Sequence, residues 1–146
     1  MQPILYNVVV ILHILLVAVW LASGLGLGGR LKRAHAKGGL ALAAAVDEAA
    51  RARVLALVGS LGTLFSGVGL IFVQYQGFKG LPVGFHLALG LVLLGLIVEF
   101  ALVGPAVKAV REGPAGLAAA KRVAAGTGVI HLIWMVSLAF MIIKKL

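Results

Sequence analysis

Three histidines lie within the apolar stretches of this chain, and their imidazole rings are the side chains there that could do chemistry. His13, His86 and His131 each stand among leucines, valines and other apolar residues. A polar side chain inside a bilayer is costly, so such a residue usually faces the interior of a helix bundle and marks a functional site. Imidazole is also a common ligand for haem iron and transition metals. We therefore expect a cofactor or metal site within a membrane.

A b-type haem takes axial ligands on opposite faces of its ring, so the two ligands should lie at similar depth. Counted from the outer ends of the predicted spans, His13 lies about 14 Å deep, His131 about 18 Å and His86 about 6 Å. This favours His13 with His131, while His13 with His86 stays open if the helices tilt. Met135, one turn after His131, is an alternative ligand for iron or copper, although a packing methionine is the simpler interpretation.

The composition predicts the elements that must position these residues. Hydrophobic residues are 62% of the 146 residues and charged residues only 12%, with a mean hydropathy of +1.15. A soluble domain of this size needs more polar surface. We predict an all-α integral membrane protein, a single domain over residues 1–146, with spans at about 3–28, 54–73, 83–103 and 123–143. The absence of cysteine excludes disulfides, iron–sulfur clusters, covalently attached c-type haem and thiolate copper sites.

The basic residues predict an orientation. Short connections favour an antiparallel four-helix bundle, and ten of the 13 basic residues lie on the two connections at one of its ends. The ten are Arg30, Lys32, Arg33, Lys37, Arg51, Arg53, Lys108, Arg111, Lys121 and Arg122. The positive-inside rule places this end in the cytoplasm and both termini outside. The net charge of +9 then reflects topology and contact with lipid headgroups, and no motif favours a nucleic-acid partner.

Several features at the basic end allow more than one interpretation. Glu99 is the only acid within a span, and it could relay protons, pair with Arg30 or Lys108, or reach water at the span's end. His35 stands in a basic segment and is predicted to be solvated. The segment 40–54 is predicted to extend the second span as a helix, with Asp47 and Glu48 paired to Arg51. Gly104-Pro105 is predicted to end or kink the third span.

Small residues form stripes that let helices, or a flat cofactor, approach the backbone closely. Simple helix packing is the more ordinary interpretation, and a second copy of the chain stays open as a partner. The stripes are Gly24 and Gly28 in the first span and Gly59, Gly62, Ser66 and Gly69 in the second.

The segment LHILLVAVWLASGLGLGGRLKRAH, residues 12–35, sets a histidine, a tryptophan seven residues on, an arginine, and a second histidine five residues later. In this spacing of His13, Trp20, Arg30 and His35 the chain resembles the start of HemJ, the membrane protoporphyrinogen oxidase family, and its relatives in the CopD group. The segment GFHLALGLVLLG resembles the family's third span and aligns His86 with its histidine.

The chain also departs from HemJ. Where HemJ carries a lysine two residues after the third-span histidine, this chain has Ala88, and Gly84 stands in place of a tryptophan. Gly104-Pro105 is closer to uncharacterised relatives of CopD, and His131 has no counterpart in HemJ. The resemblance therefore supports the broad superfamily and leaves the oxidase activity open.

The resemblance implies a four-helix bundle in a bacterial-type cytoplasmic membrane, holding haem b with His13 as an iron ligand. Trp20 would pack against the porphyrin, and Arg30 would face a propionate or an anionic substrate. Electrons would pass from a small reductant, with a porphyrinogen as one candidate, to a membrane acceptor such as quinone. The alternatives are a CopD-like copper-handling protein using the histidines and Met135, and an accessory subunit whose histidines only bridge helices.

Overall fold

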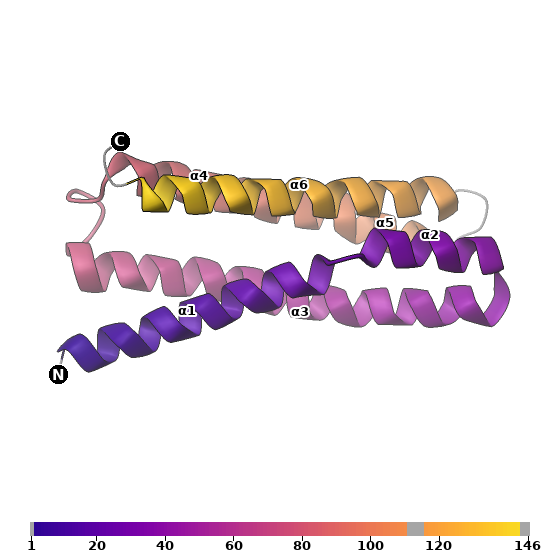
Figure 1. The fold of residues 1–146 in the computed structure, drawn as a ribbon, viewed down its shortest axis with the longest axis horizontal. Helices are drawn as coiled ribbons and strands as arrows, with labels where there is room; N and C mark the ends of the chain where they lie inside the picture. The colour runs from indigo at the N-terminus through magenta and orange to yellow at the C-terminus, as the bar shows by residue number, and fades with distance from the viewer. Residues whose placement is uncertain (1, 111–115, 144–146) are drawn as a thin grey trace.

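The computed structural model describes residues 2–110 and 116–143, and every regular element in these ranges is helical (Figure 1). In the part of the chain that the structure describes, four helical segments are long and apolar enough to cross a membrane. They are Ile4–Lys37, Gly39–Tyr75, Val83–Ala109 and Gly116–Ile142. In the described residues the prediction of an all-α protein is confirmed, as is that of four helices long and apolar enough to cross a membrane.

The first segment is broken into two helices. Helix α1 covers Gln2–Gly24 and α2 covers Leu27–Lys37, whereas the sequence predicted an uninterrupted span over 3–28. Between them Gly26 has a φ of 68°, a left-handed conformation that ends a helix and suits glycine. Arg30 donates a hydrogen bond from Nη1 to the Leu25 carbonyl, over 2.9 Å, and so satisfies an acceptor at the break.

The second segment is a single helix, α3, over Gly39–Tyr75. Its first part confirms the prediction that residues 40–54 extend the second span as a helix. At 37 residues it is about 55 Å long, well beyond the roughly 30 Å of the hydrocarbon core. One end of α3 must therefore project beyond the apolar layer.

The third segment passes through a wide turn. Helix α4 covers Val83–Val98, the π-helix η1 covers Glu99–Val103, and α5 covers Gly104–Ala109. Pro105 has no N–H and its ring clashes with the carbonyl four residues earlier. The wider π-turn accommodates this, with the Gly104 N–H bonded to the Glu99 carbonyl, so the helix continues to Ala109 and does not end at Gly104-Pro105.

Helix α6, Gly116–Ile142, completes the bundle. Helix α1 packs on α3, α4 on α6, and α2 on both α3 and α6, as Figure 1 shows. Two glycines bring backbones into contact. A Cβ at Gly59 would lie 2.6 Å from the backbone nitrogen of Trp20, and a Cβ at Gly28 would overlap Ala124. These members of the glycine stripes therefore serve helix packing.

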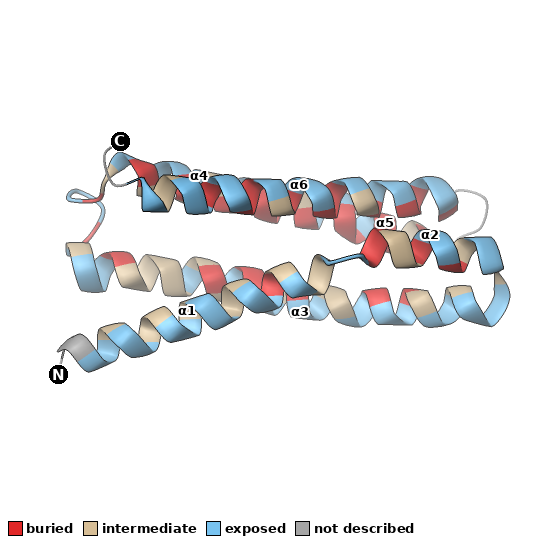
Figure 2. Ribbon diagram, in the orientation of Figure 1, coloured by how far each residue is buried: buried red, intermediate tan, exposed pale blue. Residues whose placement is uncertain are grey.

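Burial is unequal along the bundle (Figure 2). None of residues 4–19 of α1 is buried, whereas Trp20 and Leu31 are 2% and 0% exposed. The buried core continues through α2, α5 and the facing parts of α3 and α6. Large apolar side chains such as Ile11, Phe65 and Leu132 are exposed on the outside, which is compatible with contact with a lipid bilayer.

Candidate functional site

A cavity of about 220 Å³ lies among α1, α3, α4 and α6, in the part of the bundle where α1 has no buried residue. Its aromatic lining residues are Tyr6, Tyr75, Phe85 and Trp134. His13 is among the few polar residues that line it. A concave, mostly apolar site with a few polar groups is the usual form of a cofactor or ligand site.

The His13 ring is oriented by Ser66 of α3. Its Nδ1 lies 2.9 Å from Ser66 Oγ, and Ser66 Oγ donates its hydrogen to the Gly62 carbonyl over 2.6 Å. A hydroxyl has one hydrogen, so Ser66 accepts from His13 and Nδ1 carries the proton. A neutral His13 ring therefore has its lone pair on Nε2, the form in which imidazole binds a metal.

The His13 ring packs against Gly67 of α3, where the absence of a side chain leaves space for it. A Cβ at Gly67 would lie 3.2 Å from His13 Cε1, closer than side chains ordinarily pack. Ser66 and Gly67 thus fix the ring from one turn of α3, in the way that outer partners orient metal-binding histidines. The sequence placed Ser66 in a packing stripe and missed its role, because only the structure shows which side chain of α1 faces it.

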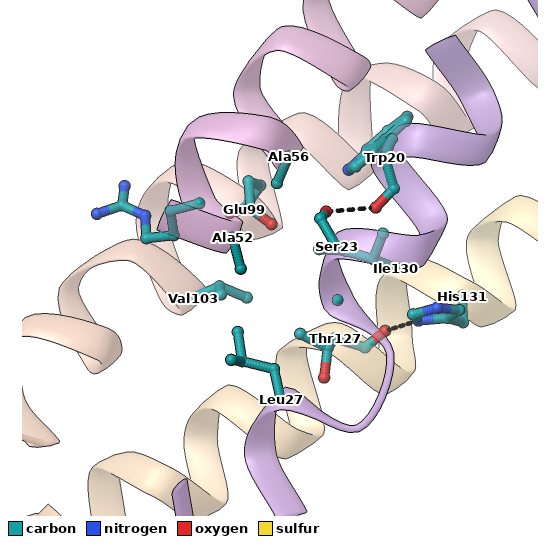
Figure 3. Close-up of a pocket in the computed structure, with 12 residues that line it drawn as sticks. Trp20, Ser23, Leu27, Ala52, Ala56, Glu99, Val103, Thr127, Ile130 and His131 are labelled. Atoms are coloured by element: carbon teal, nitrogen blue, oxygen red, sulfur yellow. Dashed lines mark hydrogen bonds between the residues drawn. The ribbon is translucent and has the colours of Figure 1, made fainter. Parts of the chain in front are cut away.

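His131 bridges helices. Its Nδ1 lies 2.6 Å from the Thr127 carbonyl, as Figure 3 shows, and its Nε2 lies 3.2 Å from the Leu21 carbonyl of α1. Both nitrogens face carbonyl acceptors, so neither presents a lone pair to a cavity. The ring also packs against Gly24, where a Cβ would lie 3.3 Å from His131 Cε1.

The structure does not bring His13 and His131 together. His131 contacts α1 at Leu21, eight residues after His13 and therefore about 12 Å further along the helix, whereas two nitrogens on one metal lie roughly 4 Å apart. The predicted depths of His13 and His131 were counted from the outer end of each span, on the assumption that these ends lie at the same height in the bundle. Figure 1 shows that α1 begins well beyond the end of α6. Residues at equal distances from these two helix ends therefore lie at different heights in the bundle.

The other candidate ligands lie outside the cavity. His86 is exposed on α4, with Nδ1 3.4 Å from the Pro82 carbonyl, and its neighbour Phe85 lines the cavity instead. Met135 is 71% exposed. Met141 lines the cavity with His13, and the sequence interpretation missed it; its spacing of seven from Trp134 places both on one helix face.

Two tryptophans separate this cavity from the rest of the bundle. Trp20 and Trp134 form an edge-to-face pair with ring centres 5.9 Å apart and an interplanar angle of 80°. Both are buried, so neither is an interface anchor. Trp134 lines the His13 cavity, and Trp20 lines a smaller cavity behind it.

At the basic end the ion pairs differ from those expected. Arg30 Nε lies 3.0 Å from Glu48 Oε1, so Glu48 pairs across α2 and α3 and not with Arg51. Arg30 lies 17 residues after His13 in the chain, in a helix that does not line the His13 cavity, and its role toward an anionic group stays a prediction.

His35 is half-buried and not solvated. A Cβ at Gly116 would lie 3.0 Å from its Cε1, and its buried Nδ1 has no hydrogen-bond partner among residues 2–110 and 116–143. The ring therefore packs between α2 and the start of α6.

Comparisons with protein-family models, curated proteins and solved structures give no match for this chain. The fold and the side chains together define a multi-pass membrane protein built as a four-helix bundle, with an aromatic-lined cavity around an oriented histidine.

Proposed function

We propose that this protein is a membrane b-type haem protein of the HemJ and CopD superfamily, which transfers electrons between a small reductant and a membrane acceptor such as quinone. The observation that supports it best is His13. The ring lines an apolar, aromatic cavity, and its hydrogen bond to Ser66 leaves the Nε2 lone pair for a metal.

We also propose that the bundle is antiparallel, with both termini outside the cytoplasmic membrane of a bacterial-type cell. The basic residues of α2, the first part of α3 and α5 support this orientation, because these elements lie at the same end of the bundle in Figure 1. A cytoplasmic position for that end satisfies the positive-inside rule.

The residues around the cavity fit one face of a haem. His13 supplies an imidazole, and Tyr75, Phe85 and Trp134 supply flat apolar walls that exclude water. Bound haem supplies one-electron chemistry at its iron. Met141 lines the same cavity, and its thioether is a second candidate ligand, since histidine with methionine is a known axial pair.

The cavity around His13 is smaller than an ordinary ligand pocket. About 220 Å³ lies below the roughly 300–1,000 Å³ of ordinary ligand pockets, so haem binding requires α1 to move outward or the ring edge to lie in lipid. Residues 4–19 of α1 have no buried side chain, but Leu16 and His13 pack on Gly62 and Gly67 of α3, so outward movement of this part breaks these contacts.

The absorption spectrum of the protein in mild detergent, before and after dithionite, tests the proposal. A strong Soret band with sharp reduced α and β bands is expected, lost in His13→Ala and kept in the exposed-site control His86→Ala. Retention of the spectrum in His13→Ala would exclude His13 as the ligand. A protein that stays colourless when haem is supplied would overturn the proposal and favour copper, tested by copper titration of the same variants.

A further inference from the structure

Glu99 is a buried carboxyl group without a partner. It begins η1, is 3% exposed, and its Oε1 has no hydrogen-bond partner in the described part of the chain. It forms no ion pair with any residue of the ranges 2–110 and 116–143. Neither partner expected from the sequence serves it, since Arg30 contacts Glu48 and Lys108 lies in the groove described below. An ionised carboxylate in this position would be costly, because no cation of the described residues contacts it: Arg53 lines the same cavity but forms no ion pair with it.

Next to Glu99 is a cavity of about 10 Å³, which is close to the space that one water molecule occupies. Figure 3 shows the carboxyl group of Glu99 directed toward the space in front of Trp20 and Ser23. The buried Trp20 Nε1 has no acceptor among the described residues. Ser23 uses its hydrogen on the Trp20 carbonyl over 2.7 Å, so its oxygen can accept. A single water there would meet a donor and two oxygen groups.

Arg53 connects this cavity to the surface. Its side chain lines the small cavity and also a groove of about 440 Å³ between α3 and α5, together with Asp47 and Lys108. Its Nη1 donates to the Gly104 carbonyl over 3.4 Å. A Cβ at Gly104 would overlap the guanidinium, so this glycine, beside the π-turn, leaves the space that Arg53 occupies.

We propose that Glu99 is an internal proton-binding site: its carboxyl group carries a proton, holds one water molecule, and exchanges that proton with the Asp47–Lys108 groove past Arg53. The charged or titratable groups that line its cavity are Arg53 from α3 and His131 from α6, while α1 contributes Trp20 and Ser23. The π-turn fits a functional position, because such turns occur frequently at functional sites. The proposal does not depend on haem.

Infrared spectroscopy of the full chain in lipid tests whether Glu99 is protonated. At neutral pH the wild type should show the carbonyl stretching band of a protonated carboxyl group, shifted to lower frequency in heavy water. The band should disappear in Glu99→Gln and persist in Glu48→Gln, which removes an exposed carboxylate of the Arg30 pair. A wild type without the band, or a band that survives in Glu99→Gln, would overturn the proposal.

A second variant removes the dependence on how Glu99→Gln folds. The chain has three glutamates, Glu48, Glu99 and Glu112, so a Glu48→Gln/Glu112→Gln protein grown with carboxyl-labelled ¹³C-glutamate carries the label at Glu99 alone. The protonated band must then show the isotope shift. An unshifted band would assign it to another group and reject Glu99.

The rate at which the Glu99 proton exchanges for deuterium in heavy water tests whether the proton passes through the groove between α3 and α5. Ala50 lines the groove and is exposed, so Ala50→Phe should narrow the groove and slow the band's shift severalfold. Ala44 is exposed on α3 and does not line the groove, and Ala44→Phe should leave the rate unchanged. Equal rates in both variants, or a wild-type proton that does not exchange, would exclude loading through the groove.

Discussion

The two ends of the bundle are built differently. Around His13, α1 has no buried residue over 4–19 and the helices enclose about 220 Å³. Around Glu99 the enclosed space is about 10 Å³. Glycines bring backbones together at both ends, Gly59 against Trp20 and Gly84 against Phe140. The end at His13, loosely packed along α1, therefore encloses a far larger cavity than the one beside Glu99 in the close-packed end, which has about the volume of one water molecule.

The hydrogen bonding of His13 also differs from that of Glu99. In the loosely packed end His13 is hydrogen-bonded to Ser66, which itself bonds to Gly62. In the close-packed end Trp20 Nε1 and Glu99 Oε1 are buried without partners among the described residues. Buried polar groups are normally satisfied, so the His13 ring is held before a ligand binds, whereas Trp20 Nε1 and Glu99 Oε1 require water. Thr63 Oγ1 and Trp134 Nε1, on the wall of the His13 cavity, also have no partner among the described residues.

The largest expected effect comes from breaking the close packing of the Glu99 end. Gly59→Leu places a side chain where a Cβ already lies 2.6 Å from the Trp20 backbone nitrogen. Overpacking against backbone should cost about 3 kcal/mol or more, measured as a large fall in the midpoint of thermal unfolding in detergent. Gly69→Leu is the matched control, because a Cβ at Gly69 meets nothing within 4 Å. Equal loss in both variants would contradict this account of the packing.

A smaller effect is expected at the His13 end, where a substitution beside His13 should weaken haem binding and leave the fold stable. Ser66→Ala removes the hydroxyl that orients His13, and loss of such an outer partner typically weakens metal binding about 10- to 100-fold. Haem titration of the protein measures this. Ser137→Ala is the control, because Ser137 is buried and its hydroxyl donates only within its own helix, to the Ile133 carbonyl. A Ser66→Ala protein with unchanged haem affinity would remove Ser66 from the site.

The sequence predicted the helices well, because a span needs only about 20 apolar residues and these are visible in the chain. It did not predict how the helices are displaced along one another. That displacement depends on where Gly59 meets Trp20, and it separates His13 from His131. The break at Gly26 and the π-turn that begins at Glu99 were likewise not predicted. A glycine can continue or end a helix, and a proline can end, kink or widen one.

The candidate site was predictable at one residue. His13 was singled out, and the structure places it in the cavity. Met135 was considered because it follows His131 by one turn, and Met141 was not considered. Had Trp134 been taken as the residue facing inward, the seven-residue spacing would have indicated Met141. The pairing of Glu48 with Arg30 and the burial of Glu99 were not predictable, since both depend on contacts between separate helices.

The smallest predicted effect concerns two buried threonines that differ in hydrogen bonding. Thr63 Oγ1 has no partner within the described residues, whereas Thr127 Oγ1 donates to the Val123 carbonyl over 2.9 Å. Thr63→Val should therefore leave stability unchanged or raise it by about 0.5–1 kcal/mol, because it removes a buried polar group without breaking a bond. Thr127→Val should lower it by about 0.6 kcal/mol, the average for a hydrogen bond inside a membrane protein. Unfolding of both variants under one condition measures the sign directly. A loss at Thr63 equal to that at Thr127 would mean that water or a ligand bonds the Thr63 hydroxyl in the His13 cavity, and the polar groups of the two ends would then differ more than the described residues alone show.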